Sequence, residues 1–405
     1  MRGFLSAFSV KSFRFQWPAD LLSSFALEME VLILNWFVLV ETKSVTALAL
    51  FAGLQYLGSL IAPAMGALAD RIGRRRTLST LRALYTALAV IIMMLDLCGF
   101  MEPIYIFVIA AIAGLIRPSD LVMRNALIGD TMPSDKLANA MGLSRTTMDT
   151  ARMTGALVGA GLLTMLGLGI AYAFVAALYF LSFVLTLRVA HIDTDDAPST
   201  PVNPFRQVLD GLAYVRRTPA VLALMWLAFL VNLTGFPLVS NSGLLSYVAR
   251  EVYGLDATGL SHLAASFGVG SLVASIVMAA TGGARRPIYL VFGGTAIWHI
   301  LLLVFAFSSE KTEGMALLFL VGVAQGVAMI SMAVALLRLA EARFRGRVMG
   351  VRMLAVYGLP MGLALVGPAT DALGFQGAAL AAASFGLGII ALIAFIWRRA
   401  LFFDH

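Results

Sequence analysis

The segment Gly66-Ala-Leu-Ala-Asp70-Arg71-Ile-Gly73-Arg74-Arg75-Arg76 is a dense cationic turn between two long apolar runs. A short arginine-rich loop between two membrane spans lies on the cytoplasmic side. Gly66 permits two helices to approach closely, and Gly73 permits the chain to turn. Asp70 is suited to accept hydrogen bonds from backbone amides at the start of a neighbouring helix. A generic cytoplasmic loop explains the arginines, but it does not explain the spacing of the glycines and the Asp-Arg pair.

The composition indicates an integral membrane protein with many spans. Hydrophobic residues make up 60% of the 405 residues, charged residues make up 13%, and the mean hydropathy is +0.91. A soluble globular protein of this length does not need so much apolar surface. The net charge is +7, but the basic residues are scattered over loops, so no nucleic-acid partner is expected. The single cysteine, Cys98, excludes an intramolecular disulfide and a cysteine-based metal cluster.

Twelve apolar segments are long enough to cross a bilayer, which takes roughly 20 residues. Charged or turn-forming residues separate them, as at Glu102-Pro103, Gly167–Gly169 and Arg285-Arg286-Pro287. The expected spans are residues 17–40, 45–69, 77–99, 103–128, 137–166, 168–190, 219–249, 257–281, 287–308, 314–340, 346–371 and 374–398.

The distribution of lysine and arginine sets the orientation of these spans. The loops on one side carry most of the basic residues, whereas the other side carries Lys43, Arg250 and Lys311. We therefore expect both termini in the cytoplasm and a multi-pass protein of the cell (inner) membrane. This orientation requires an even number of spans, which twelve satisfies.

The longest polar stretch lies at mid-chain and divides the protein into two halves. Within it, Phe205, Val208, Leu209, Leu212 and Val215 recur at helical spacing, which predicts a short amphipathic helix on the inner leaflet. We expect an N-terminal six-helix bundle over residues 1–190, a cytoplasmic linker containing this helix over 191–218, and a C-terminal six-helix bundle over 219–405.

Several segments resemble a known family. The Gly66–Arg76 loop resembles the loop between helices 2 and 3 of major facilitator superfamily (MFS) transporters. Within that superfamily, the chain is similar to the branch of enterobactin exporters and macrolide efflux proteins. The segments that carry this similarity are Phe13-Arg14-Phe15, Arg117-Pro118-Ser119, Asn203-Pro204-Phe205 and Arg345-Gly346-Arg347.

The resemblance implies an all-α integral membrane fold with twelve transmembrane helices in two pseudo-symmetric six-helix bundles. Ala140-Met141-Gly142 and Val348-Met349-Gly350 form a weak internal repeat that agrees with it. Antiporters of the superfamily often carry Gly-Pro-x-x-Gly-Gly in the fifth helix. Here the glycines are kept and the proline is absent. We also expect a cytoplasmic gate in which Asp70 bonds to the eleventh helix and Arg74 pairs with Asp130; its residues are Gly66, Asp70, Arg71, Gly73, Arg74 and Asp130.

Two glutamates near the middle of the first span, Glu28 and Glu30, are candidates for proton coupling. A charge inside the membrane is costly, so such residues point to function. Residues two apart lie roughly 200° around a helix, so the two side chains occupy different faces. We expect one to bind a proton or a cationic substrate and the other to contact a neighbouring helix. A purely structural ion pair is the alternative for either one.

Two further helices carry stripes of charge. The fourth span has Arg117, Asp120 and Arg124 on one face, and the fifth has Arg145, Asp149 and Arg152. If these helices are antiparallel and adjacent, the stripes meet arginine to aspartate and form a charge-neutralised structural pair, which is the interpretation that we favour for most of these residues. The two stripes together contain four arginines and two aspartates, so two arginines lack an acidic partner within them. A glutamate of the first span is the candidate partner for one of these arginines, and an anionic substrate is the candidate partner for the other. The aspartates join the glutamates as proton-coupling candidates, and Arg117, Arg152 and Glu30 are candidate substrate-binding residues.

The second half carries fewer charges inside its spans. Asn232 and Asn241 mark a polar, breakable stretch of the seventh span, and Gln325 lies in the tenth. Polar, interrupted helices at mid-depth often line substrate sites in transporters. These three residues complete the candidate substrate-binding set.

These features predict a secondary transporter that works by alternating access. The function that we expect is proton-coupled efflux of an amphiphilic small molecule, either a drug or a siderophore. A lysolipid or lipid transporter and an importer of a small organic solute are the alternatives. No Walker pattern, nucleophile elbow or metal-ligand spacing occurs, so no enzyme activity, cofactor or metal is expected. The expected partners are the small-molecule substrate, protons and membrane lipid, and we expect a monomer.

Overall fold

The computed structural model describes residues 6–59, 72–189, 204–239, 244–280, 286–341 and 344–402, which contain helices and no strand. Nine helices in this part of the chain are long and apolar enough to cross a membrane. In a bilayer the backbone must satisfy its own hydrogen bonds, which long apolar helices do. The α-helices are α1 (Lys11–Thr42), α2 (Val45–Leu54), α4 (Arg74–Leu97), α5 (Pro103–Thr131), α6 (Ser134–Thr186), α7 (Pro204–Arg217), α8 (Pro219–Thr234), α9 (Phe236–Val239), α10 (Leu245–Tyr247), α11 (Ala257–Ala280), α12 (Pro287–Phe305), α13 (Lys311–Leu339), α14 (Arg345–Leu354), α15 (Gly358–Ile396) and α16 (Arg398–Phe402).

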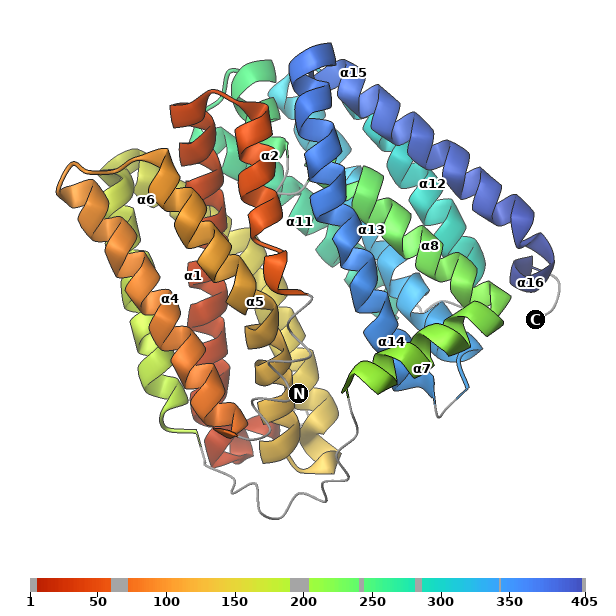
Figure 1. Ribbon diagram of the computed structural model, residues 1–405, viewed down its shortest axis with the longest axis horizontal. Helices are drawn as coiled ribbons and strands as arrows, with labels where there is room; N and C mark the ends of the chain where they lie inside the picture. Colours follow the sequence, from red (N-terminus) through yellow and green to blue (C-terminus); the bar gives the residue numbers. More distant parts are fainter. Residues whose placement is uncertain are drawn as a thin grey trace. The chain divides into compact units, whose positions relative to one another are not determined.

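Two of the long helices are each a pair of spans joined at a glycine. α6 breaks at Gly167 (φ 79°, ψ 175°) and α15 breaks at Gly374 (φ 70°, ψ 169°). Figure 1 shows α15 turning back at such a break. Both backbone conformations are accessible to glycine and strained for other residues. The expected boundary between the fifth and sixth spans is thus confirmed. α2 covers the beginning of the expected second span and is followed by a short 3-10 helix at Leu57–Ser59. Residues 60–69 of that span lie outside the described residues, so the total of twelve stays a prediction.

Proline and glycine set the starts of several helices. Pro103, Pro219 and Pro287 stand in the first turns of α5, α8 and α12, where a missing backbone N–H costs nothing. The expected boundaries at Glu102-Pro103 and Arg286-Pro287 are confirmed. Gly73 has a φ of 100° and directly precedes α4, so the predicted turn at this residue is also confirmed.

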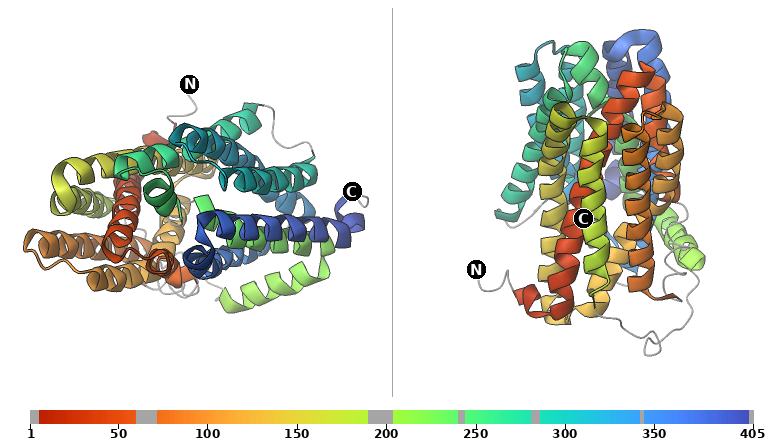
Figure 2. Two further views of the ribbon diagram at one scale, coloured as in Figure 1. Left: turned by 90° about the horizontal axis from the view of Figure 1, so that it is seen from above. Right: turned by 90° about the vertical axis from the view of Figure 1, so that its left-hand side faces the viewer.

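The chain divides into two compact units. Unit 1 comprises Met1–Glu41 and Leu54–Pro201, and unit 2 comprises Thr42–Gly53 and Val202–His405. In unit 1, α1, α4 and α6 run nearly parallel or antiparallel to one another (Figure 2, right). In unit 2, Val215 of α7 packs into an apolar core with α8, α12 and α13. The predicted amphipathic helix is therefore present as α7, while the domain boundaries 1–190, 191–218 and 219–405 stay a prediction.

Glycines bring helix backbones into direct contact within each unit. In unit 1, Gly155 and Gly159 of α6 lie against Phe25, Glu28 and Met29 of α1. In unit 2, Gly270 of α11 and Gly322 of α13 lie against each other's helix backbones. Lipid is as apolar as the side chains, so helices in a membrane associate through such close packing.

Replacing Gly322 with alanine tests this packing. A Cβ atom at this position would lie 2.1 Å from the carbonyl oxygen of Phe267, so the helices must separate. We expect a loss of stability of about 1–3 kcal/mol, the usual cost of overpacking. Thermal unfolding of the detergent-solubilised protein would show it as a lower Tm.

Gly293→Ala is the matched control. A Cβ atom there meets nothing within 4 Å, and alanine stabilises a helix relative to glycine. Its Tm should be unchanged or slightly higher. Equal Tm values for the two variants would contradict the role of close packing.

Candidate functional site

Four charged side chains from α1, α4 and α5 form a buried network in unit 1, the aspartate–arginine quartet of Asp20, Arg82, Asp120 and Arg124. Arg82 Nη2 donates to Asp20 Oδ1, and Arg124 Nη2 donates to Asp120 Oδ2 over 2.8 Å. Cross contacts close the ring, with Arg124 Nε 3.5 Å from Asp20 Oδ1 and Arg82 Nε 3.7 Å from Asp120 Oδ1. Each aspartate therefore faces two arginines, and the four charges balance.

Hydroxyl groups occupy further positions around the two guanidinium groups. Arg82 Nη1 donates to Thr186 Oγ1 over 2.5 Å, and Arg124 Nη1 donates to Ser24 Oγ over 2.8 Å. The Arg82 side chain has no exposed surface. A charge at the bilayer centre costs about 2.5–3.5 kcal/mol on insertion scales. Pairing and hydrogen bonding offset this cost and allow four charges to stand inside the unit.

A second ion pair in the same unit joins α1 to α5. Arg117 Nη2 lies 2.9 Å from Glu30 Oε2, and the Tyr179 hydroxyl donates to the same oxygen over 2.8 Å. Arg117 Nη1 donates to Gln55 Oε1 over 2.6 Å. We call this the Glu30–Arg117 pair. In contrast to the quartet, one acid pairs with one arginine among the side chains that the structure describes.

A third contact links the other glutamate to α6. Arg152 Nε lies 3.7 Å from Glu28 Oε1, and the side chains are 51% and 19% exposed, respectively. The 6% exposure of the Glu30 side chain marks that residue as the buried one of the two glutamates. The prediction that Glu28 and Glu30 occupy different helix faces is confirmed, because they bind different arginines.

The described members of the two charge stripes pair with α1 and α4, and the expected pairing of α5 with Arg145 and Asp149 stays a prediction. The α5 residues Arg117, Asp120 and Arg124 contact acidic and basic groups of α1 and α4, and Arg152 of α6 contacts α1 instead of α5. The side chains of Arg145 and Asp149 lie outside the described part of the structure. Glu30 and Glu28 pair with Arg117 and Arg152, so these two arginines are not the unpartnered cations expected for an anionic substrate.

Two members of the quartet, Asp20 and Arg82, were missed by the sequence reasoning. Each interrupts a long apolar run, over residues 17–40 and 77–99, respectively. A charge inside such a run is itself a signal, because its cost requires a partner on another helix. That signal exists in the sequence, but the identity of the partner does not.

Some members of the expected gate can be placed. Arg74 at the start of α4 donates from Nη1 to Oδ1 of Asp130 at the end of α5 over 2.5 Å. The expected contact between these two residues is therefore confirmed. Gly73 forms the turn before α4. Gly66, Asp70 and Arg71 lie outside the described residues, so the remainder of the gate stays a prediction.

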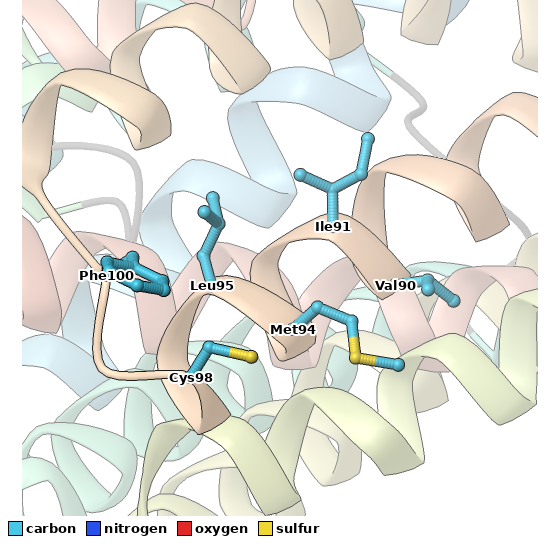
Figure 3. Close-up of a pocket in the computed structure, with 6 residues that line it drawn as sticks. All are labelled: Val90, Ile91, Met94, Leu95, Cys98 and Phe100. Carbon is cyan, nitrogen blue, oxygen red and sulfur yellow. The ribbon is translucent and has the colours of Figure 1, made fainter.

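The candidate residues of unit 2 do not form a comparable network. Asn232 Nδ2 donates to the backbone carbonyl of Ala228 over 2.8 Å, Gln325 is half-buried in α13, and Asn241 lies outside the described residues. A surface hollow at the end of α4 is lined by apolar side chains and the Cys98 thiol (Figure 3). Among the described residues, no three His, Cys, Asp or Glu side chains are grouped as metal ligands.

Residues 3–365 match the Major Facilitator Superfamily. The chain is 28% identical to multidrug resistance protein MdtG of Enterobacter lignolyticus over 322 residues, which are 76% of this chain and 74% of that protein. It is 34% identical to MdtG of a Rahnella species over 157 residues, or 36% of each chain.

Solved transporter structures share the fold. A bacterial homologue of the human lysosomal transporter Spinster matches with a TM-score of 0.77 at 14% identity, covering 96% of this chain and 97% of that one. The nucleoside transporter NupG matches with a TM-score of 0.75 at 12% identity, covering 97% of this chain and 100% of that one.

Asp20→Asn tests the quartet. The substitution leaves Arg82 and Arg124 to share one aspartate, and removing one partner of a buried ion pair costs about 3–5 kcal/mol. We expect a large fall in Tm in detergent, partly reversed when Arg82→Gln is added, because the charges then balance again.

Asp130→Asn is the matched control, since it makes the same change in another aspartate paired with arginine. The side chains of Arg74 and Asp130 are 33% and 34% exposed, and exposed ion pairs contribute about 0–1 kcal/mol. Similar Tm shifts in the two variants would show that burial does not set the strength of the quartet.

Proposed function

The chain belongs to the major facilitator superfamily, and on that basis we propose that it exports an amphiphilic small molecule, such as a cationic drug, in exchange for protons. The observation that carries the proposal is the similarity to multidrug resistance proteins over 76% of the chain. Membrane-spanning helices fill most of the sequence, as a multi-pass transporter requires. Siderophores are a narrower substrate class for which we find no specific support.

The loop charges support an orientation with both termini in the cytoplasm. The cationic turn over residues 66–76 would then face the cytoplasm, as the positive-inside rule requires. The contact of Arg74 with Asp130 would belong to the gate on that side. We place the protein in the cell (inner) membrane.

The Glu30–Arg117 pair is the element that we propose to couple protons to the conformational change. Among the described side chains Glu30 pairs with one arginine, so protonation of its carboxylate would remove the acidic partner of Arg117 and leave the hydrogen bond to Gln55. A buried charge without a counter-charge is costly, so this state favours a rearrangement. Asp120 is less suited, because two arginines hold it and a second aspartate shares them.

Glu28 and Arg152 are the candidates for substrate contact in unit 1. Both side chains are more exposed than those of the Glu30–Arg117 pair, so a substrate can reach them. A carboxylate of this kind suits a cationic amphiphile. Each proton that moves inward supplies about 2.3 kcal/mol per 100 mV of membrane potential, to which the pH difference adds.

Transport in proteoliposomes with an imposed pH gradient tests the proposal. We expect the wild type to move ethidium against its gradient. Glu30→Gln should abolish the dependence on the pH gradient, because the side chain can no longer exchange a proton. Glu28→Gln should retain that dependence and weaken the apparent affinity for ethidium, because the carboxylate that attracts the cation is lost.

Glu102→Gln, an exposed glutamate before α5, serves as the control and should behave like the wild type. Ethidium movement that ignores the pH gradient in the wild type would contradict proton coupling. Movement of a lysolipid under the same conditions would then favour lipid transport, and movement in the opposite direction would favour import.

A further inference from the structure

The short helix α16, which follows α15 in unit 2 (Figure 1), packs against the start of α12. Leu401 of α16 is 1% exposed and belongs to the same apolar core as Ile288 and Phe292 of α12. The ring centroid of Phe402 lies 5.1 Å from that of Tyr289 and 5.7 Å from that of Phe292. The end of α15 and the start of α12 therefore lie at the same end of the unit, joined by α16.

Exposed arginines border this contact on both sides. Arg286 directly precedes α12, and its Cζ atom lies 6.0 Å from the ring centroid of Tyr289. Arg398 begins α16, and its Cζ atom lies 5.2 Å from the ring centroid of Phe395. Arg399 is the next residue of α16 and is also exposed. We call Arg286, Arg398 and Arg399 the α12–α16 arginines.

The α12–α16 arginines have no counter-charge from the described part of the chain, where none of them forms an ion pair with an acidic side chain. The buried arginines of the quartet, in contrast, are all paired. Guanidinium groups present several N–H donors in a planar fork that matches the oxygens of a phosphate group. A cluster of exposed, unpaired arginines is therefore suited to bind a phosphate anion.

The surface beside these arginines is apolar and open. The side chains of Tyr289, Phe395 and Ile396 are 54%, 67% and 56% exposed, respectively. They stand on α12 and α15, and both helices are long and apolar enough to cross a membrane. In a bilayer, such side chains face lipid chains, while arginines at the ends of the spans reach the headgroups. The anion that fits this surface is therefore one that carries an apolar body.

We propose that the α12–α16 arginines bind the headgroup of an anionic phospholipid whose acyl chains lie along Tyr289 and Phe395. Charge complementarity selects an anionic headgroup, because a zwitterionic one brings a positive charge of its own to the arginines. In the orientation proposed above, this end of unit 2 faces the inner leaflet, where anionic lipids attract basic residues. A lipid held in this way connects the start of α12 to α16 and stabilises their contact.

Native mass spectrometry of the detergent-solubilised protein tests the site. Dioleoyl phosphatidylglycerol and dioleoyl phosphatidylcholine carry the same acyl chains, so the difference between their affinities measures the headgroup. We expect the wild type to bind phosphatidylglycerol more tightly. Arg286→Gln should weaken this binding roughly fivefold and the double variant Arg398→Gln/Arg399→Gln roughly 25-fold, since each basic residue near a membrane surface contributes a factor of roughly five. The affinity for phosphatidylcholine should be unchanged in these variants.

Arg216→Gln/Arg217→Gln is the matched control, because it removes another pair of adjacent exposed arginines, in the last turn of α7. It should bind phosphatidylglycerol as the wild type does. Equal weakening in the two double variants would show a general attraction to surface charge and overturn the site. Equal affinities of the wild type for the two lipids would also overturn it.

Thermal unfolding gives a second measurement, because a ligand that binds the folded state stabilises it. Phosphatidylglycerol should raise the Tm of the wild type more than that of Arg286→Gln, which leaves α16 unaltered and keeps the test valid if the double variant does not fold. Displacement of phosphatidylglycerol by inorganic phosphate would overturn the lipid as the occupant. Neither measurement involves transport, so failure of gradient-driven ethidium export would leave the lipid site standing.

Discussion

The cost of placing a charge inside a membrane protein governs the arrangement of unit 1. Arg82 is completely buried, and its contacts with Asp20, Asp120 and Thr186 tie α4 to α1, α5 and α6. An arginine cannot be neutralised by losing its proton, so these helices must keep their acidic and hydroxyl groups close to it. The register of four spans relative to one another follows from this requirement.

Close backbone packing makes such contacts possible. Gly155 and Gly159 bring α6 against α1 beside Glu28 and Met29, and this approach brings Arg152 within reach of Glu28. The same physical device joins α11 and α13 in unit 2, where Gly270 and Gly322 lie against the backbone of the other helix. Unit 1 therefore combines tight packing with buried charge, a combination suited to holding a few ionisable groups in defined positions.

The number of arginines around each acid separates two kinds of site. Asp20 and Asp120 share two arginines, so loss of one negative charge leaves the other in place. Among the described side chains, Glu30 pairs with one arginine, Arg117, and it accepts a hydrogen bond from Tyr179. The first arrangement is a network of four charges that hold one another, and the second is a single ion pair supported by a tyrosine hydroxyl. The quartet and the Glu30–Arg117 pair are both built from arginines and acidic side chains. They differ in the number of arginines that each acidic side chain contacts among the described residues.

Apolar run length, helical periodicity, proline and glycine positions and loop charge were enough to predict the all-α membrane fold, the turns at Gly73 and Gly167 and the helix at Pro204–Arg217, whereas the contact of Arg74 with Asp130 was expected from the resemblance to a family. These features are local, because a span must be long and apolar and a turn must relieve backbone strain wherever it occurs. The partners of the buried charges depended on tertiary structure. A uniformly apolar helix does not record its rotation about its own axis, so the sequence left open which helices Asp20, Arg82 and Arg117 face. Helix packing settled those partners, and with them the distinction between the quartet and the Glu30–Arg117 pair.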